Sequence, residues 1–328
     1  MTAPLLSLPN ELKQEVIGHL DTQAILSLRL VNKDLLNNVQ ETQAFENLFE
    51  QVTIHLHPQS LELFKAICAS PILSKVVKKV SVSILAFSEP PNPSILTEQD
   101  HSIFNELVAM EDHYFTHGGA STDLAACLEE LPSCSSITLV QKLGMFKEKS
   151  KCLKLFQRML LPLEATERYQ DRVHGSSDDR TMYGNVHYRN DILSSVLRSI
   201  ARDTMFIHEF VLETEYEDLY ILEDLAPPLL PHEISTAAFA NIRTFELQVL
   251  DPGSYENDEE ILVQLLAGMK HLTHFALIAN SGSDRTNSSD LLDALSIPHL
   301  KSFRLVGMSF CASHFLDFMR KHADLLKE

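Results

Sequence analysis

The sequence contains little of what several kinds of functional site are built from. Its 328 residues include ten glycines, five cysteines and no tryptophan. So few glycines leave little material for a phosphate-binding loop, and neither a Gly-rich phosphate motif nor a Gly-x-Ser-x-Gly elbow occurs. The cysteines are odd in number and widely spaced, which predicts reduced, buried thiols and argues against a disulfide framework or a cysteine zinc site. They are Cys68, Cys127, Cys134, Cys152 and Cys311.

Long apolar runs and an excess of positive charge are missing as well. No apolar run is long enough to cross a bilayer and no charged-then-apolar leader opens the chain, so we expect no membrane partner. The net charge of −18 disfavours nucleic acid as the main ligand, because phosphate binding needs clustered Lys and Arg. A hydrophobic content of 45% is ample for a core. These features predict a soluble protein of the cytoplasm or the nucleus.

Histidine, whose imidazole is a frequent zinc ligand, occurs fifteen times. His113 and His117 would lie one turn apart on a helix, a spacing that can bind zinc. They lack the adjacent Glu of a metalloprotease, and Gly118 and Gly119 should end the helix at once. We therefore expect no enzyme, no metal and no cofactor. A hydrolase or metal enzyme within an irregular α/β domain stays an alternative, which a pocket joining His113, His117 and acidic side chains would favour.

Apolar residues at helical spacing mark three short helices in the first forty residues. Leu8, Leu12, Val16 or Ile17, and Leu20 form one stripe, and Pro9 suits the first turn because its missing N–H would have no partner there. The faces of the second and third helices would be Ala24, Ile25, Leu28 and Val31, and Leu35, Leu36 and Val39. Helices this short cannot bury every stripe among themselves, so apolar surface must remain for the rest of the chain or for a partner.

The order of residue types in this segment resembles the F-box family. The matching elements are Leu8-Pro9-Asn10-Glu11-Leu12, Ile17-Gly18-His19-Leu20 and Leu28-Arg29-Leu30-Val31-Asn32-Lys33. Many F-boxes carry Trp soon afterwards, and Asp34-Leu35-Leu36 stands there instead, which looks like the form common in fungal F-box proteins.

The resemblance implies that residues 1–45 form a three-helix F-box that docks on a Skp-type adaptor and, through it, on a cullin. The residues matching the family's docking motif are Leu8, Pro9, Leu12, Ile17, Leu20, Leu28, Leu30 and Val31. Some of these eight must instead fill the small core, and the pattern cannot sort them.

Beyond residue 45, short segments with alternating apolar residues recur and predict strands. They are 49–54, 77–82, 134–139, 207–212, 242–247, 272–277 and 300–305. Val52 and Val80 are 28 residues apart, as are Phe275 and Phe303. Helical patterns lie between the strands, at 61–69, 123–131, 191–203, 259–269 and 288–295. This alternation predicts that residues 46–328 form an irregular leucine-rich-repeat-like solenoid, with parallel strands on the concave side and helices outside. A non-repetitive α/β domain is the alternative.

The resemblance and the repeats together predict an adaptor. The chain would be the substrate receptor of a Skp–cullin–F-box ubiquitin ligase, holding an unknown protein substrate with its repeat domain. A repeat scaffold that uses its F-box for assembly without ubiquitin transfer is the alternative. The stretch from Glu209 to Asp224 is rich in acidic residues and also contains Tyr216 and Tyr220. These two tyrosines are candidate substrate contacts, because aromatic anchors are frequent in binding hot spots.

Overall fold

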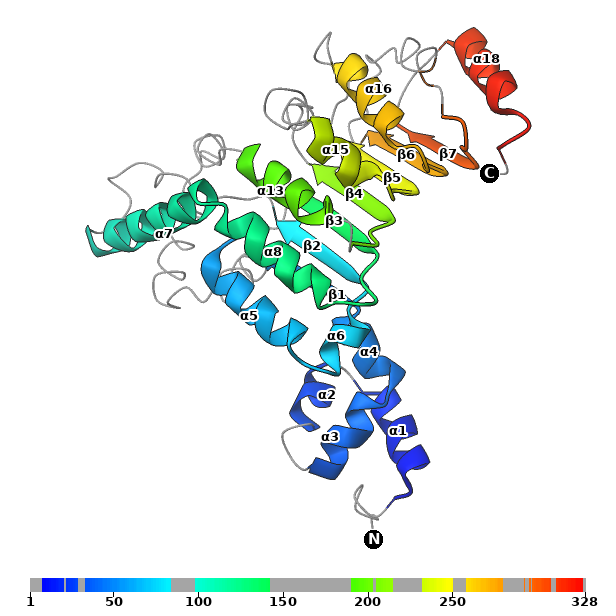
Figure 1. The fold of residues 1–328 in the computed structure, drawn as a ribbon. Coiled ribbons are helices and arrows are strands. Elements are labelled where there is room, and N and C mark those ends of the chain that lie inside the picture. The colour runs from blue at the N-terminus through cyan, green and yellow to red at the C-terminus, as the bar shows by residue number, and fades with distance from the viewer. Residues whose placement is uncertain are drawn as a thin grey trace, which may run out of the picture.

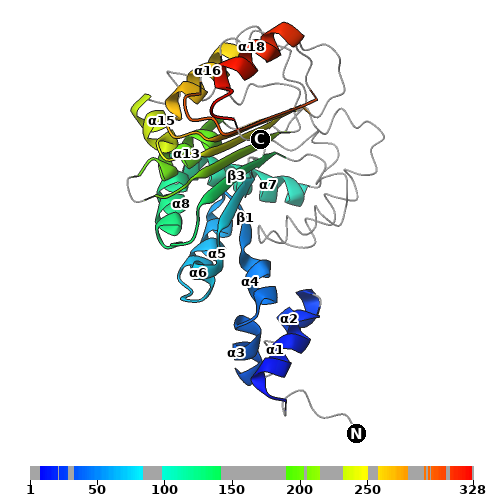
Figure 2. The ribbon, with the colours of Figure 1, turned by 90° about the vertical axis from the view of Figure 1, so that its right-hand side faces the viewer.

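The structure is a computed structural model in which α-helices accompany one large parallel sheet (Figure 1). It describes residues 8–20, 22–28, 33–83, 98–141, 190–202, 205–214, 232–249, 258–279, 292, 295, 297–307 and 311–326. The N-terminal helices project from the end of the sheet next to β1, and the C-terminus lies at the opposite end (Figures 1 and 2). No described helix is both long enough and apolar enough to cross a membrane.

Seven strands form the sheet, and their order in space is their order in the chain. They are β1 (Gln51–His55), β2 (Lys79–Ser83), β3 (Ser136–Gln141), β4 (Glu209–Thr214), β5 (Thr244–Val249), β6 (His274–Ala279) and β7 (Ser302–Val306). All neighbouring pairs are parallel, which confirms the α/β class and the parallel sheet. Each strand begins two residues later than the sequence pattern indicates. In most units the first apolar residue of the pattern, such as Ile242, is buried in the turn before the strand.

Equivalent positions of the seven strands lie side by side in one unbroken register. One row runs Val52, Val80, Ile137, Phe210, Phe245, Phe275 and Phe303. The Phe rings of this row stack, with centroids 6.2 Å apart from Phe210 to Phe245 and 6.0 Å apart from Phe245 to Phe275. The recurring Phe position of the sequence is therefore a continuous ladder of aromatic rings inside the main core.

Helices line one face of the sheet in the same order as the strands (Figure 1). They are α5 (Pro58–Cys68), α8 (Gly119–Glu129), α13 (Asn190–Ile200), α15 (His232–Phe239), α16 (Asp258–Gly268) and α18 (Ala312–His322). Neighbouring helices from α5 to α16 contact one another. Four of the five predicted helices are confirmed, and most of the fifth, 288–295, lies outside the described residues.

The interval between β2 and β3 holds two helices in succession. Val80 and Ile137 are 57 residues apart, which leaves room for about two repeats, but no strand is found among the described residues of that interval. A 19-residue helix, α7 (Glu98–Thr116), precedes α8 instead. Gly118 separates the two helices with a φ of 68°, a left-handed conformation that favours glycine. The glycine pair ends α7 as expected.

The N-terminal helices pack around a second, smaller core. They are α1 (Asn10–Gly18), α2 (Thr22–Leu28), α3 (Lys33–Gln40) and α4 (Gln43–Phe49). Ile17, Ile25, Val39 and Phe45 fill this core, and Leu73 of α6 (Leu73–Val76) packs against it. The expected domain boundary at residue 45 falls within α4, which contacts both β1 and α6. Helix α4 thus packs both with the N-terminal helices and with the sheet, and the domain boundary at residue 45 stays a prediction.

Candidate partner-docking surface

One side of α1 exposes apolar side chains to solvent. Pro9, Leu12 and Val16 are spaced by three and four residues, which places them on one helical face. Leu12 is 46% exposed and Val16 is 40% exposed. We call these three residues the α1 stripe. Leu8, half-buried, precedes it, and the exposed Glu11 and Glu15 lie beside it. The arrangement of an apolar centre with a charged border is that of a protein interface.

The opposite side of α1 holds the helix against its neighbours. Ile17 is fully buried among Ile25, Val39 and Phe45, so its side chain is not available to a partner. The Lys13 side chain, 6% exposed, extends to α3, where its Nζ lies 2.7 Å from Asp34 Oδ2. The Gln14 amide donates a hydrogen bond to Glu41 at 2.8 Å. These contacts fix the rotation of α1 and direct the stripe outward.

The eight residues predicted for adaptor docking differ in how far they are exposed. Leu8, Pro9 and Leu12 have exposed surface, Ile17 is core, and Leu20 and Leu28 are half-buried against the small core. Leu30 and Val31 lie outside the described residues, as do Tyr216 and Tyr220. Val16, 40% exposed on the α1 stripe, was not among the eight. The sequence offered Val16 or Ile17 for one position of the stripe, and apolar character alone could not tell them apart.

The histidine pair lies at the exposed end of α7, and its ring centroids are 4.1 Å apart. The Nδ1 atom of His117 is 2.8 Å from the His113 carbonyl oxygen. No group of three or more His, Cys, Asp or Glu side chains suited to a metal occurs among the described residues. A pocket of about 280 Å³ between α4, β1 and α5 is lined without any titratable side chain. Neither feature favours the enzyme alternative.

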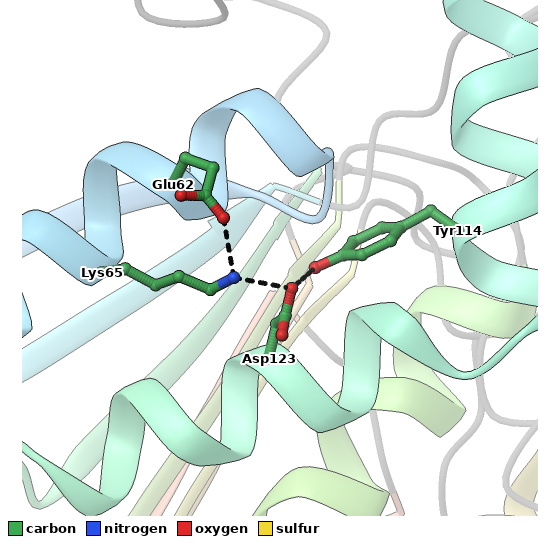
Figure 3. A network of polar contacts seen from close by, with 4 residues as sticks. All are labelled: Glu62, Lys65, Tyr114 and Asp123. Carbon is green, nitrogen blue, oxygen red and sulfur yellow. Dashed lines mark hydrogen bonds and ion pairs between the residues drawn. The ribbon is translucent and has the colours of Figure 1, made fainter.

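A polar network joins α5, α7 and α8 (Figure 3). Lys65 Nζ lies 2.7 Å from Glu62 and 3.0 Å from Asp123, and the Tyr114 hydroxyl donates to Asp123 at 2.6 Å. Burial, and then the bond to Asp123, raises the pKa of Tyr114 well above its ordinary value. Hydrogen bonds to Glu62 and Asp123 raise the pKa of Lys65. These polar atoms are satisfied by one another, so the network fastens three helices together.

The buried thiols agree in part with the sequence expectation. Cys68, Cys127 and Cys134 are buried and free, whereas Cys311 is exposed at the start of α18. Cys152 lies outside the described residues. The expectation of burial is therefore wrong for Cys311. In the chain Cys68 and Cys127 are far apart, yet the fold buries both in the main core, on the contacting helices α5 and α8.

Comparison with known proteins agrees with the geometry of the N-terminal helices. Residues 5–40 match the F-box domain, a range that includes the whole α1 stripe together with Ile25, Asp34 and Val39. No curated protein matches the chain significantly. The chain therefore contains an F-box domain, formed by residues 5–40.

Proposed function

We propose that this chain is the substrate-receptor subunit of a Skp–cullin–F-box ubiquitin ligase and that the α1 stripe contacts the Skp-type adaptor. The observation that carries the proposal is the exposed apolar face formed by Pro9, Leu12 and Val16 within the F-box domain. Exposed apolar patches with a polar border mark interaction sites, because burying them in a complex removes them from water. Through the adaptor the chain would join a cullin.

The rest of the chain would hold the substrate. We take residues 46–328 to be an irregular leucine-rich-repeat-like solenoid with strands on its concave side. The support is that every strand pairs with the strands before and after it in the chain, and that the outer helices follow the same order. In a solenoid each repeat contacts mainly its neighbours, and the open face and the end remain for binding. We also propose that the F-box is of the form common in fungal proteins, with Asp34-Leu35-Leu36 in place of the Trp that many F-boxes carry.

The mechanism would be proximity. The receptor performs no bond chemistry itself and instead raises the effective concentration of a substrate lysine beside the ubiquitin thioester. Such a receptor needs no cofactor, metal, membrane or nucleic acid, and it would act in the cytoplasm or the nucleus. Tyr216 and Tyr220 stay candidates for substrate contact.

The adaptor contact is tested by reversing the character of the α1 stripe. The double variant Leu12→Glu, Val16→Glu places two carboxylates at the proposed contact, and we expect it to lower the affinity for a purified Skp-type adaptor at least about tenfold. Leu63→Glu is the matched control, because Leu63 is 45% exposed on α5, far from α1. Isothermal titration measures affinity, and circular dichroism checks folding. Equal affinity of the folded double variant and the control would contradict the proposal.

Ubiquitin transfer needs its own measurement. A non-catalytic scaffold would bind the adaptor equally well, so binding alone does not separate it from a receptor. A reconstituted ligase containing this chain should ubiquitinate a protein that the repeat domain binds, and it should lose that activity with Leu12→Glu, Val16→Glu. Adaptor binding together with no transfer to any bound protein would favour the scaffold.

A further inference from the structure

The two ends of the sheet differ in how they are covered. Beyond β1, helix α4 packs on the strand and contacts α6. Beyond β7, no described residue adds another strand. Phe303 and Leu305 of β7 are only half-buried, whereas their neighbours Phe275 and Leu277 on β6 are 2% and 1% exposed. Val306 is 38% exposed. No described residue therefore pairs with the outer edge of the last strand, and apolar side chains lie next to that edge.

Helix α18 extends this open surface. One of its sides faces the preceding unit, because Lys321 Nζ donates a hydrogen bond to the carbonyl oxygen of Leu295 at 2.8 Å. Phe318 packs inward on Phe303, with ring centroids 4.5 Å apart. The side turned away from Lys321 carries Ala312, Leu316, Met319 and Ala323, all exposed. We call these four residues the α18 stripe.

The α18 stripe has the spacing of a helix-packing seam, alternating four and three residues. Leu316 is 53% exposed and Met319 is 36% exposed. A repeat array buries the edge of each unit against the next, and its last unit normally has a polar outer side. Here the last unit instead has a strand edge that no described residue pairs with, and an apolar helix side. These are the two surfaces on which a further strand and its accompanying side chains would pack.

Two cations without a partner among the described residues lie at this end, although the net charge of the chain is −18. Lys301 and Arg304 are exposed on and beside β7, and neither side chain pairs with a described residue. A second copy of the chain would place these cations next to their own counterparts, because both copies would present the same edge. An acidic partner segment meets them with opposite charge.

We propose that β7 and the α18 stripe bind an extended segment of a partner protein in which apolar and acidic residues alternate, and that this segment adds an eighth strand to the sheet. Its backbone would pair with the open edge of β7, the mode known as β-augmentation. Alternate side chains of a strand point to opposite faces. Apolar side chains would thus cover Phe303 and Leu305 on the helix side, and acidic side chains would face Arg304 on the other. If the chain is a substrate receptor, as proposed above, its substrates would contain such a segment of alternating apolar and acidic residues.

The test uses the full chain and a fluorescein-labelled peptide in which Val alternates with Glu. Its control is the same peptide with Lys in place of Glu. We expect fluorescence anisotropy to report binding of the Glu peptide and at least about tenfold weaker binding of the Lys peptide. Arg304→Glu should reverse this preference, and Leu316→Glu should weaken both. Methylating alternate peptide nitrogens should abolish binding, because the added strand would lose its hydrogen bonds to β7.

Several outcomes would overturn the proposal. They are equal binding of the two peptides, no binding of the Glu peptide at millimolar concentration, and no effect of Arg304→Glu and Leu316→Glu. A stable dimer of the free chain that Leu316→Glu dissociates would assign the surface to a second copy instead. The variant Leu12→Glu, Val16→Glu should bind the Glu peptide normally, so failure of the adaptor contact and failure of this surface are distinguishable.

Discussion

Val16 and Ile17 are neighbours in the chain and have different surroundings. Val16 is 40% exposed, and Ile17 is fully buried among the side chains of the small core. Ile17→Ala leaves a cavity and should lower the free energy of unfolding of the N-terminal helices by about 2–4 kcal/mol. Val16→Ala should change it by less than about 0.5 kcal/mol and should still weaken adaptor binding. Urea denaturation and adaptor titration of both variants measure the two effects.

The two variants control each other, since they differ by one residue in position and both remove methyl groups. If Val16→Ala destabilised the helices and left adaptor affinity unchanged, the assignment of the α1 stripe would be wrong. The same pair shows where prediction from sequence ends. Both residues fit an apolar stripe, and the choice between them depends on Ile25, Val39 and Phe45, which reach Ile17 only after the chain has folded.

At the level of elements, the sequence predicted the strands better than the helices. Each strand has alternating apolar residues, and the repeated Phe position marks the ladder from Phe210 to Phe303. Helix α7 was not predicted as an element, because it lies in an interval where further repeats were expected. Helix α18 was not predicted either, although its inner Phe315 and Phe318 continue the core. Whether a strand edge stays open, and which apolar residues of a helix face solvent, follow from three-dimensional packing, which periodicity alone does not show.

The polar network of α5, α7 and α8 provides a prediction about helix packing. Asp123→Asn removes the ion pair with Lys65 and weakens the acceptor of the Tyr114 hydroxyl. Lys65 is 38% exposed, so solvent screens part of the loss, and we expect about 1 kcal/mol less stability of the sheet domain. Urea denaturation, followed by tyrosine fluorescence and circular dichroism, measures the change.

Glu62→Gln is the matched variant for this network. It also removes one carboxylate beside Lys65, but Glu62 is 70% exposed and bonds to no other helix of the network. We expect its effect to stay below about 0.5 kcal/mol. Equal losses for Asp123→Asn and Glu62→Gln would mean that the network contributes through general charge and not through the joining of helices.

The whole molecule has two apolar cores of very different size. Among the described residues the small core contains four buried side chains, whereas the main core extends from β1 to α18. Little buried apolar surface means a low free energy of local opening. Amide hydrogen exchange should therefore be faster in α1, α2 and α3 than in β3 to β6. Adding the Skp-type adaptor should slow exchange mainly in α1, because a partner that binds the folded form stabilises it.

Mass spectrometry of peptides from the two regions measures this difference in the intact chain. Exchange at one common rate in both regions would show that the two cores open together through α4, which contributes Phe45 to the small core and contacts β1. Protection by the adaptor spread evenly over the sheet would contradict a contact confined to the N-terminal helices.

The unbroken register of the sheet also sets a length. Adjacent strands lie about 4.8 Å apart, so the path from β1 to β7 across the seven strands spans on the order of 30 Å. Backbone hydrogen bonds fix this spacing whatever the side chains are. Insertion or deletion of one strand–helix unit would move whatever binds at the far edge by one strand width relative to the N-terminal helices. The separation between the two ends can therefore change only in discrete steps, and each step would leave the chemistry of both ends unaltered.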